Sequence, residues 1–310
     1  MDIPVYLIAG FLEGGKTNFI NGILRDGFAN DGRTLLLCCE EGTEEYDPKA
    51  LRDVDVVTVE EESKLSQSYL KELEKKHSPK QIIIEYNGMW EMQKLYYDYL
   101  PKNWVLYQIM TFVDATTFDV YVKNMGSLMM EKLRNADMIV FNRCTQKERD
   151  ALRKRNLKMV NRQADIYLEN DDGTSEDYAD KTVSAFDLSK DEIVVKDEDY
   201  GLWYVEAMDI PERFDGKTVK LKAMMCKSPN FSDGFVPGRF AMVCCANDIT
   251  FLAVACVGGD VSKFKNRDWV YITAEVKAEK CTAYGEEPGP VLHVISVVPS
   301  EPAKDEVIQF

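Results

Sequence analysis

One short segment near the N-terminus combines residue types that suit phosphate binding. It is GFLEGGKT, from Gly10 to Thr17, and it matches the pattern G-x-x-x-x-G-K-[ST] at every fixed position. In this pattern glycines let backbone N–H groups turn toward phosphate oxygens, the lysine reaches the terminal phosphates and the threonine hydroxyl suits Mg2+. The alternative is a glycine-rich turn that binds nothing. We predict a phosphate site with contacts from Gly10, Glu13, Gly14, Gly15, Lys16, Thr17 and Asn18.

A second chemically capable group follows another apolar run. Residues 82–88, IIIEYNG, give a buried strand pattern that ends at Glu85. In open α/β folds, ligands collect at the carboxyl ends of the strands. We therefore expect Glu85 to hold a metal-bound water or to orient an attacking one, and the Gly88 N–H to meet a terminal phosphate. The alternative is that Glu85 simply ends a strand at the surface.

The elements that must position these residues alternate along the first part of the chain. Apolar strand-like runs are separated by amphipathic, helix-like segments. This alternation predicts an α/β domain with a mostly parallel sheet covered by helices on both faces, as in P-loop NTPases. The predicted strands are Ile3–Ala9, Thr34–Cys39, Val54–Val59, Gln81–Glu85, Tyr107–Val113 and Met138–Asn142.

The second part of the chain shows a different pattern. Short strands separated by turn clusters indicate a small all-β domain, an OB-like barrel or a sandwich. We expect the α/β domain over residues 1–185, an acidic linker over 186–200, the all-β domain over 201–300 and a tail over 301–310. The predicted strands of the second domain are Trp203–Met208, Thr218–Cys226, Arg239–Cys245, Thr250–Cys256, Trp269–Ala278 and Val291–Val298.

Composition and charge exclude some partners. The 310 residues are 45% hydrophobic and 29% charged, which is typical of a globular protein, and the net charge is -15. A chain this acidic has no general electrostatic attraction for phosphate backbones or anionic lipid. Nucleic acid is therefore not an expected partner. The charge is local: residues 40–62 hold 10 acidic and 2 basic residues, and residues 169–199 hold 12 and 3.

The sequence also bears on location and redox state. No window approaches the roughly 18 uninterrupted apolar residues of a membrane span, and the N-terminus lacks a secretory pattern. We expect a cytoplasmic protein without membrane insertion. Four of the eight cysteines form two adjacent pairs, Cys38-Cys39 and Cys244-Cys245. Neighbours in a strand point to opposite faces, so reduced thiols are expected rather than bridges.

Five sequence blocks, in this order, resemble the CobW-like branch of the CobW, HypB and UreG GTPases. They are GFLEGGKTN from Gly10, CEEGTEEYD ending at Asp47, EYNG from Glu85, VDA from Val113 and NRCT from Asn142. The resemblance implies a Mg-dependent GTPase whose residues 39–47 form a switch ordered by nucleotide and metal. It implies catalytic roles for Lys16, Glu85 and Glu40, and Mg2+ contacts from Thr17, Glu85 and Asp47.

Two blocks depart from the pattern of these GTPases. Their Cys-x-Cys-Cys motif, which suits zinc or a similar transition metal, is replaced by VTVEEESKLSQ, whose carboxylates prefer harder ions. The guanine-reading N-K-x-D element is here Asn142, Arg143, Cys144 and Thr145, and a neutral threonine accepts hydrogen bonds only weakly. The resemblance implies base contacts from Asn142 and Arg143, with GTP as the expected nucleotide and ATP as an open alternative.

The second domain resembles the C-terminal domain of the YcgQ-like bacterial proteins, which accompany a predicted membrane permease. The similar strings run from Gly234 to Asp248 and from Asn266 to Ala274. In the first string, Cys244 and Cys245 offer thiolates to zinc or another transition metal. The alternative is that one of the pair is buried as a small apolar side chain.

Three uses of the chain follow as expectations. The first is a slow GTPase in metal trafficking or in the regulation of a membrane transporter, with a permease or a metalloprotein as its client. The second is a nucleotide-gated adaptor with negligible hydrolysis. The third is a metal-binding chaperone that uses the C-terminal cysteine pair.

Overall fold

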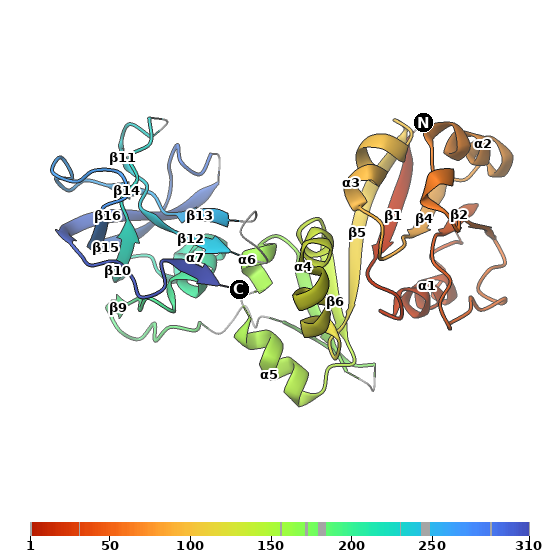
Figure 1. Cartoon of the computed structure of the whole chain (residues 1–310), viewed down its shortest axis with the longest axis horizontal. Coiled ribbons are helices and arrows are strands. Elements are labelled where there is room, and N and C mark those ends of the chain that lie inside the picture. Colours follow the sequence, from red (N-terminus) through yellow and green to blue (C-terminus); the bar gives the residue numbers. More distant parts are fainter. Residues whose placement is uncertain are drawn as a thin grey trace. The chain divides into compact units, whose positions relative to one another are not determined.

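A computed structural model gives the fold of the chain in two compact units (Figure 1). It describes residues 2–30, 32–155, 157–170, 173–178, 184–229, 231–242, 249–285 and 287–309. The first unit takes in residues 1–154 and 163–179, and the second takes in residues 155–162 and 180–310. Among the described helices, none combines the length and the apolar composition that crossing a membrane requires.

The first unit is built on an eight-stranded sheet in the order β3-β2-β4-β1-β5-β6-β7-β8. All neighbouring strands are parallel except β7 and β8. This arrangement confirms the predicted mostly parallel sheet. The strands are β1 (Ile3–Ala9), β2 (Thr34–Cys38), β3 (Val54–Thr58), β4 (Gln81–Glu85), β5 (Trp104–Asp114), β6 (Met138–Asn142), β7 (Asp165–Glu169) and β8 (Ser175–Asp177).

Helices bury both faces of this sheet, because alternate strand residues point to opposite sides. On one face, Ile8 and Ile83 pack with Ile20 of helix α1 (Lys16–Arg25). On the other, Leu7 and Ile84 belong to a core that includes apolar residues of α2 (Gln67–His77) and η2 (Leu95–Tyr99). The remaining helical segments of the unit are η1 (Glu62–Lys64), α3 (Met92–Lys94), α4 (Phe118–Arg134) and α5 (Gln146–Lys154).

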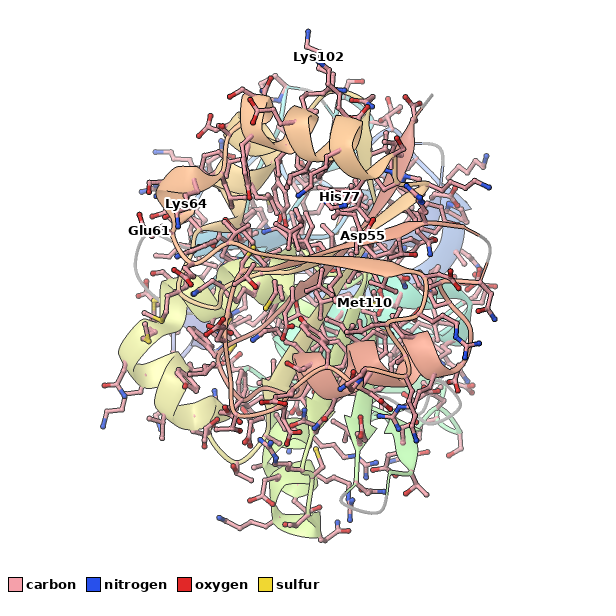
Figure 2. The ribbon with its side chains drawn as sticks, turned by 90° about the vertical axis from the view of Figure 1, so that its right-hand side faces the viewer. Asp55, Glu61, Lys64, His77, Lys102 and Met110 are labelled. Atoms are coloured by element: carbon pink, nitrogen blue, oxygen red, sulfur yellow. The ribbon has the colours of Figure 1, made fainter. Side chains whose placement is uncertain are left out.

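Polar contacts fix both ends of α2. The Ser66 hydroxyl caps its N-terminus by accepting a hydrogen bond from the Tyr69 N–H. At its C-terminal end, Nδ1 of His77 lies 3.0 Å from a carboxylate oxygen of Asp55 on β3 (Figure 2). The helix is thereby joined to the edge strand of the sheet.

The second unit is rich in strands. Its nine-stranded sheet has the order β11-β14-β16-β15-β10-β12-β13, with β9 beside β10 and β17 beside β12. The strands are β9 (Glu192–Val194), β10 (Thr218–Met224), β11 (Gly234–Phe235), β12 (Gly238–Met242), β13 (Ile249–Ala253), β14 (Cys256–Val257), β15 (Trp269–Lys280), β16 (Pro288–Pro299) and β17 (Val307–Gln309). Its helices are α6 (Leu157–Val160), α7 (Tyr200–Asp209) and η3 (Pro211–Arg213).

Three segments of this unit differ from their predicted descriptions. The strand predicted at Trp203–Met208 is wrong, because these residues lie in α7, which packs Trp203 and Ala207 into the core. The expected linker contributes β9, paired in parallel with β10. The expected tail contributes β17, paired in parallel with β12. The last two segments complete the sheet rather than trail from it.

Candidate functional site

The glycine-rich segment forms a tight turn between β1 and α1. The Gly14 N–H donates to the Phe11 carbonyl oxygen at 3.1 Å. Gly15 has a φ of 94°, and a Cβ there would lie 2.4 Å from the side-chain nitrogen of Asn142. Only glycine adopts this positive φ readily and has no Cβ to clash with Asn142, so only glycine fits here without strain. The turn therefore presents backbone N–H groups at the start of α1, the arrangement that favours a phosphate.

Lys16 lies under this turn and is almost fully buried. Its ammonium group donates to the carbonyl oxygens of Gly10, at 3.0 Å, and Phe11, at 2.9 Å. Its third contact is a 2.5 Å ion pair with the carboxylate of Glu40. An ammonium group has three N–H donors, so groups of the chain itself occupy all of them.

Thr17 and Glu85 bring oxygen atoms together beside the lysine. The Thr17 hydroxyl donates to one Glu85 oxygen at 2.7 Å, and the Tyr46 hydroxyl donates to the other. Burial raises the pKa of Glu85, an effect that these two hydrogen bonds oppose. A buried carboxylate next to a hydroxyl is a donor set that fits Mg2+, which prefers oxygen ligands.

Gly88 brings the segment after β4 against the phosphate loop. A Cβ at this position would lie 2.6 Å from the Phe11 Cα and 2.7 Å from the Gly10 carbonyl oxygen. Only glycine permits this approach. It places the Gly88 N–H beside the loop, where it donates to the second oxygen of Glu40 at 3.2 Å.

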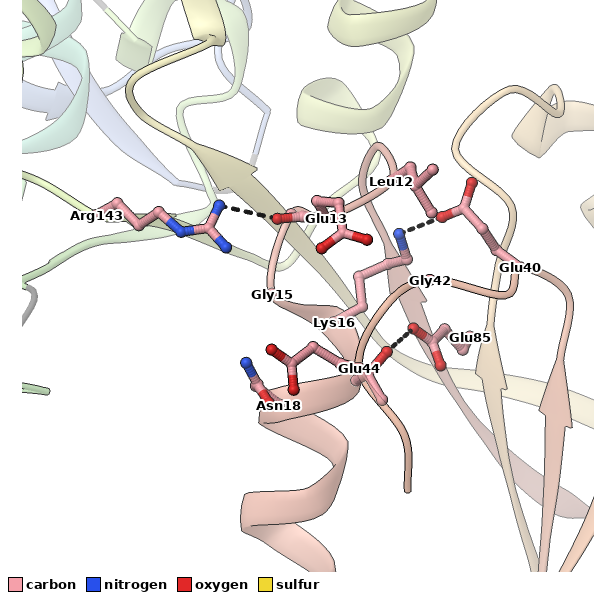
Figure 3. A pocket seen from close by; sticks show the side chains of 12 residues that line it. Leu12, Glu13, Gly15, Lys16, Asn18, Glu40, Gly42, Glu44, Glu85 and Arg143 are labelled. Atoms are coloured by element: carbon pink, nitrogen blue, oxygen red, sulfur yellow. Dashed lines mark hydrogen bonds and ion pairs between the residues drawn. The ribbon is translucent and has the colours of Figure 1, made fainter. Parts of the chain in front are cut away.

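Side-chain hydrogen bonds and an ion pair hold the segment after β2 against the phosphate loop. Besides the two contacts of Glu40, the Glu13 carboxylate accepts hydrogen bonds from the Thr43 N–H and hydroxyl, both at 3.0 Å. These bonds lower the pKa of Glu13. Figure 3 shows the resulting pocket, which is lined by Leu12, Glu13, Gly14, Gly15, Lys16, Thr17, Asn18, Glu40, Gly42, Glu44, Glu85 and Arg143.

The end of β6 joins the same loop. The Asn142 side-chain amide donates to the Gly14 carbonyl oxygen at 2.6 Å, while its own oxygen is buried without a hydrogen-bond partner among the described residues. Arg143, at a φ of 54°, donates to the Glu13 carbonyl oxygen at 2.9 Å and pairs with Asp114. Burial alone would raise the pKa of Asp114, but hydrogen bonds from Thr116 and Arg143 lower it.

Most of the site residues expected from the sequence thus lie together. The exception among the described residues is Asp47, whose carboxylate accepts the Lys49 N–H at 2.9 Å and lies 3.7 Å from Arg25. Its neighbour Tyr46 makes the contact with Glu85 instead. The expected metal ligands Cys244 and Cys245 lie outside the described residues.

Sequence reasoning missed several residues of the site. Tyr46 and Thr43 lie in the predicted switch, and Asp114 lies in the VDA block, so the sequence blocks marked these three positions. The sequence did not indicate that they contact Glu85, Glu13 and Arg143, respectively. Lys132 of α4 is the least expected. It is fully buried, donates to the Trp90 carbonyl oxygen at 3.3 Å and lies 5.4 Å from the centre of the Phe11 ring. Burial lowers its pKa to about 8.

The described part of the chain holds no ready-made transition-metal centre. It contains no group of three or more His, Cys, Asp or Glu side chains arranged to hold a metal ion. Its cysteines are free thiols: Cys38, Cys39, Cys144, Cys226, Cys256 and Cys281. Burial raises the pKa of Cys39 and of Cys256, which keeps both thiols neutral and suits them to packing.

The mostly parallel sheet and the turn before α1 define a P-loop nucleotide-binding protein. Residues 4–167, more than half of the chain, match the model described as CobW/HypB/UreG, nucleotide-binding domain. The chain therefore belongs to the CobW/HypB/UreG family. Residues 169–308 match the model described as DUF1980 C-terminal domain.

The chain is similar to 15 chains of solved structures. The crystal structure of the hydrogenase maturation factor HypB from Archaeoglobus fulgidus is 18% identical, with a TM-score of 0.39, over 55% of this chain and 81% of that one. No curated protein matches the chain.

Proposed function

We propose that the first unit binds a Mg-nucleoside triphosphate and hydrolyses it slowly, with GTP as the preferred nucleotide. The observation that carries the proposal is the convergence of Lys16, Thr17 and Glu85 on one pocket, around a turn that presents backbone N–H groups, with the Gly88 N–H bound to Glu40 of the same pocket. These groups come from segments far apart in the sequence. Between them they supply what a bound triphosphate and its cation need.

Each residue has a role that follows from its position. Lys16 and the N–H groups at the start of α1 bind the phosphates, and Thr17 with Glu85 holds the cation. Mg2+ held by these two residues would supply charge neutralisation for the bound phosphates. The buried Glu85 carboxylate also has the chemistry to orient a water molecule. Asn142 and Arg143 stabilise the phosphate loop, because they donate to the carbonyl oxygens of Gly14 and Glu13.

The preference for GTP rests on the family and not on the base-reading element of this chain. Thr145 occupies the position at which the resemblance implies an aspartate, and its hydroxyl donates to Glu148. ATP therefore stays in the proposal as a second nucleotide. The proposal extends to use of the nucleotide cycle in the cytoplasm, in metal trafficking or in control of a transporter, with a metalloprotein or a permease as client.

A nucleotide-gated adaptor with negligible hydrolysis is a second candidate. It is favoured by one observation, that the chain itself occupies all three donors of Lys16. A protein in which groups of the chain bind the lysine of the phosphate site suits the role of a switch as well as that of a catalyst. The expected chaperone role of Cys244 and Cys245 stays a proposal, to be tested by metal analysis of the Cys244→Ser, Cys245→Ser double variant.

The test is calorimetry of the full chain with MgGTP and MgATP. Wild type is expected to bind at least one of them, and Lys16→Ala to bind neither. Lys102→Ala, which removes an exposed lysine away from the pocket, is the control and should bind as wild type does. Absence of binding by wild type would overturn the proposal. Single-turnover hydrolysis then separates the two candidates, because persistent triphosphate favours the adaptor.

A further inference from the structure

The Glu40 carboxylate bridges two donors from separate segments of the first unit. One oxygen lies 2.5 Å from the Lys16 ammonium, and the other accepts the Gly88 N–H at 3.2 Å. Figure 3 shows the Lys16 and Glu40 side chains pointing toward each other. The Glu40 side chain is only 8% exposed, so the carboxylate is held inside the site and not at its rim.

These two donors share one kind of ligand. An ammonium group and a backbone N–H that converge on a single point favour an anion with at least two oxygen atoms. A terminal phosphoryl group is such an anion, and in the proposed function it contacts both Lys16 and the Gly88 N–H. The Glu40 carboxylate therefore occupies the place that the terminal phosphate would take.

Further contacts hold Glu40 in this place. On its N-terminal side, the Cys39 N–H donates to the Glu85 carbonyl oxygen at 2.9 Å. On its C-terminal side, Thr43 is bound by Glu13 and the Tyr46 hydroxyl donates to Glu85. Glu40 thus lies in a segment anchored on both sides.

We propose that Glu40 is an internal competitor of the terminal phosphate, and that it sets the preference of this site between nucleoside diphosphate and triphosphate. The inference rests on the proposed function, because it concerns the same pocket. A triphosphate must displace the carboxylate from both Lys16 and Gly88. A diphosphate ends before it reaches the Gly88 N–H, so it binds with Glu40 in place.

The Glu40→Gln variant tests this competition. Its amide oxygen can still accept the Gly88 N–H, but it carries no charge to hold Lys16. We expect its affinity for a non-hydrolysable Mg-GTP analogue to rise about tenfold, the change expected from loss of one charge-assisted contact. Its affinity for MgGDP should change less than twofold. Calorimetry of the full chain measures both constants.

Glu41→Gln is the matched control, because Glu41 is the exposed neighbour of Glu40 and does not line the pocket. It removes one charge of the same sign and should leave the triphosphate-to-diphosphate ratio as in wild type. A Glu40→Gln ratio equal to that of wild type, or a loss of triphosphate affinity, would overturn the inference. The first result would mean that Glu40 only neutralises a buried lysine, and the second that it assists triphosphate binding.

Failure of this inference is separable from failure of the proposed function. If wild type binds the analogue and Lys16→Ala does not, the phosphate site stands whatever the Glu40→Gln ratio is. If wild type binds no nucleotide and Glu40→Gln binds none either, the proposed function itself fails. Thermal unfolding of each variant checks that the fold is retained.

Discussion

The side-chain amide of Asn142 donates to the Gly14 carbonyl oxygen at 2.6 Å, which joins the end of β6 to the phosphate loop across 128 residues of sequence. Arg143 repeats the connection through the Glu13 carbonyl oxygen. The residues that follow therefore leave from the wall of the nucleotide pocket. Thr145, at the position where the resemblance implies an aspartate, follows Arg143 by two residues, and its hydroxyl donates to Glu148.

The Thr145→Asp variant is expected to increase selectivity for guanine only when Glu148 is changed as well. The Thr145 hydroxyl now donates to the Glu148 carboxylate, so an aspartate there would meet a like charge. With Glu148→Gln added, the aspartate can accept from guanine, and preference for GTP over ATP should rise roughly tenfold. Competition binding measures the ratio. Equal ratios in the double variant and in Glu148→Gln alone would contradict the prediction.

The stability contribution of Glu85 should fall as pH rises. Burial raises the pKa of this carboxyl in the folded state above the usual 4.5 of a glutamate, so the folded state binds more protons than the unfolded state in that range. The free energy of unfolding of wild type relative to Glu85→Gln should therefore decrease from pH 4.5 upward, through the raised pKa. Urea unfolding at several pH values measures it.

Lys132 should show the opposite dependence on pH. Burial lowers its pKa in the folded state to about 8, against the usual 10.5 of a lysine, so the unfolded state binds more protons between these two values. The stability of wild type relative to Lys132→Met should then rise by roughly 3 kcal/mol from pH 8 to pH 10.5. Urea unfolding across this range is the measurement. A constant difference between the two proteins would show that the lysine is not desolvated.

The Arg239→Lys substitution is expected to destabilise the second unit by roughly 2 kcal/mol. The Arg239 guanidinium is buried and donates to the carbonyl oxygens of Asp197, at 2.5 Å, and Asp305. A lysine ammonium lacks the planar fork that reaches both. Urea unfolding followed by tryptophan fluorescence tests this, with Lys263→Arg at an exposed site as the control. A midpoint equal to that of wild type would contradict it.

The parts of the site that the sequence predicted are those set by local chemistry. The phosphate loop depends on glycine spacing and one lysine, and Glu85 depends on the end of a buried strand. The contacts of Glu40, Thr43 and Tyr46 depend instead on how a loop folds over a distant turn. No short-range pattern encodes that packing, so these partners emerged only in three dimensions.

The strand wrongly predicted at Trp203–Met208 has a physical cause. Along these residues burial alternates, with Trp203, Val205 and Ala207 buried and their neighbours partly exposed. In the sequence, WYVEAM holds two aromatic residues and a β-branched valine, residue types that favour a strand. In the structure, Tyr200, Trp203, Tyr204 and Ala207 face the core at helical spacing, and Leu202 is exposed. Tertiary packing outweighed the local pattern.

The division of the chain between its two units has a practical consequence for dissecting the protein. The chain enters the second unit at residue 155, returns to the first at residue 163 and leaves it again at residue 180. No single proteolytic cut can therefore release one unit whole. A fragment that starts at residue 186 would lack residues 155–162, including α6, and a gene truncated at residue 185 would encode a first unit that still carries part of its neighbour.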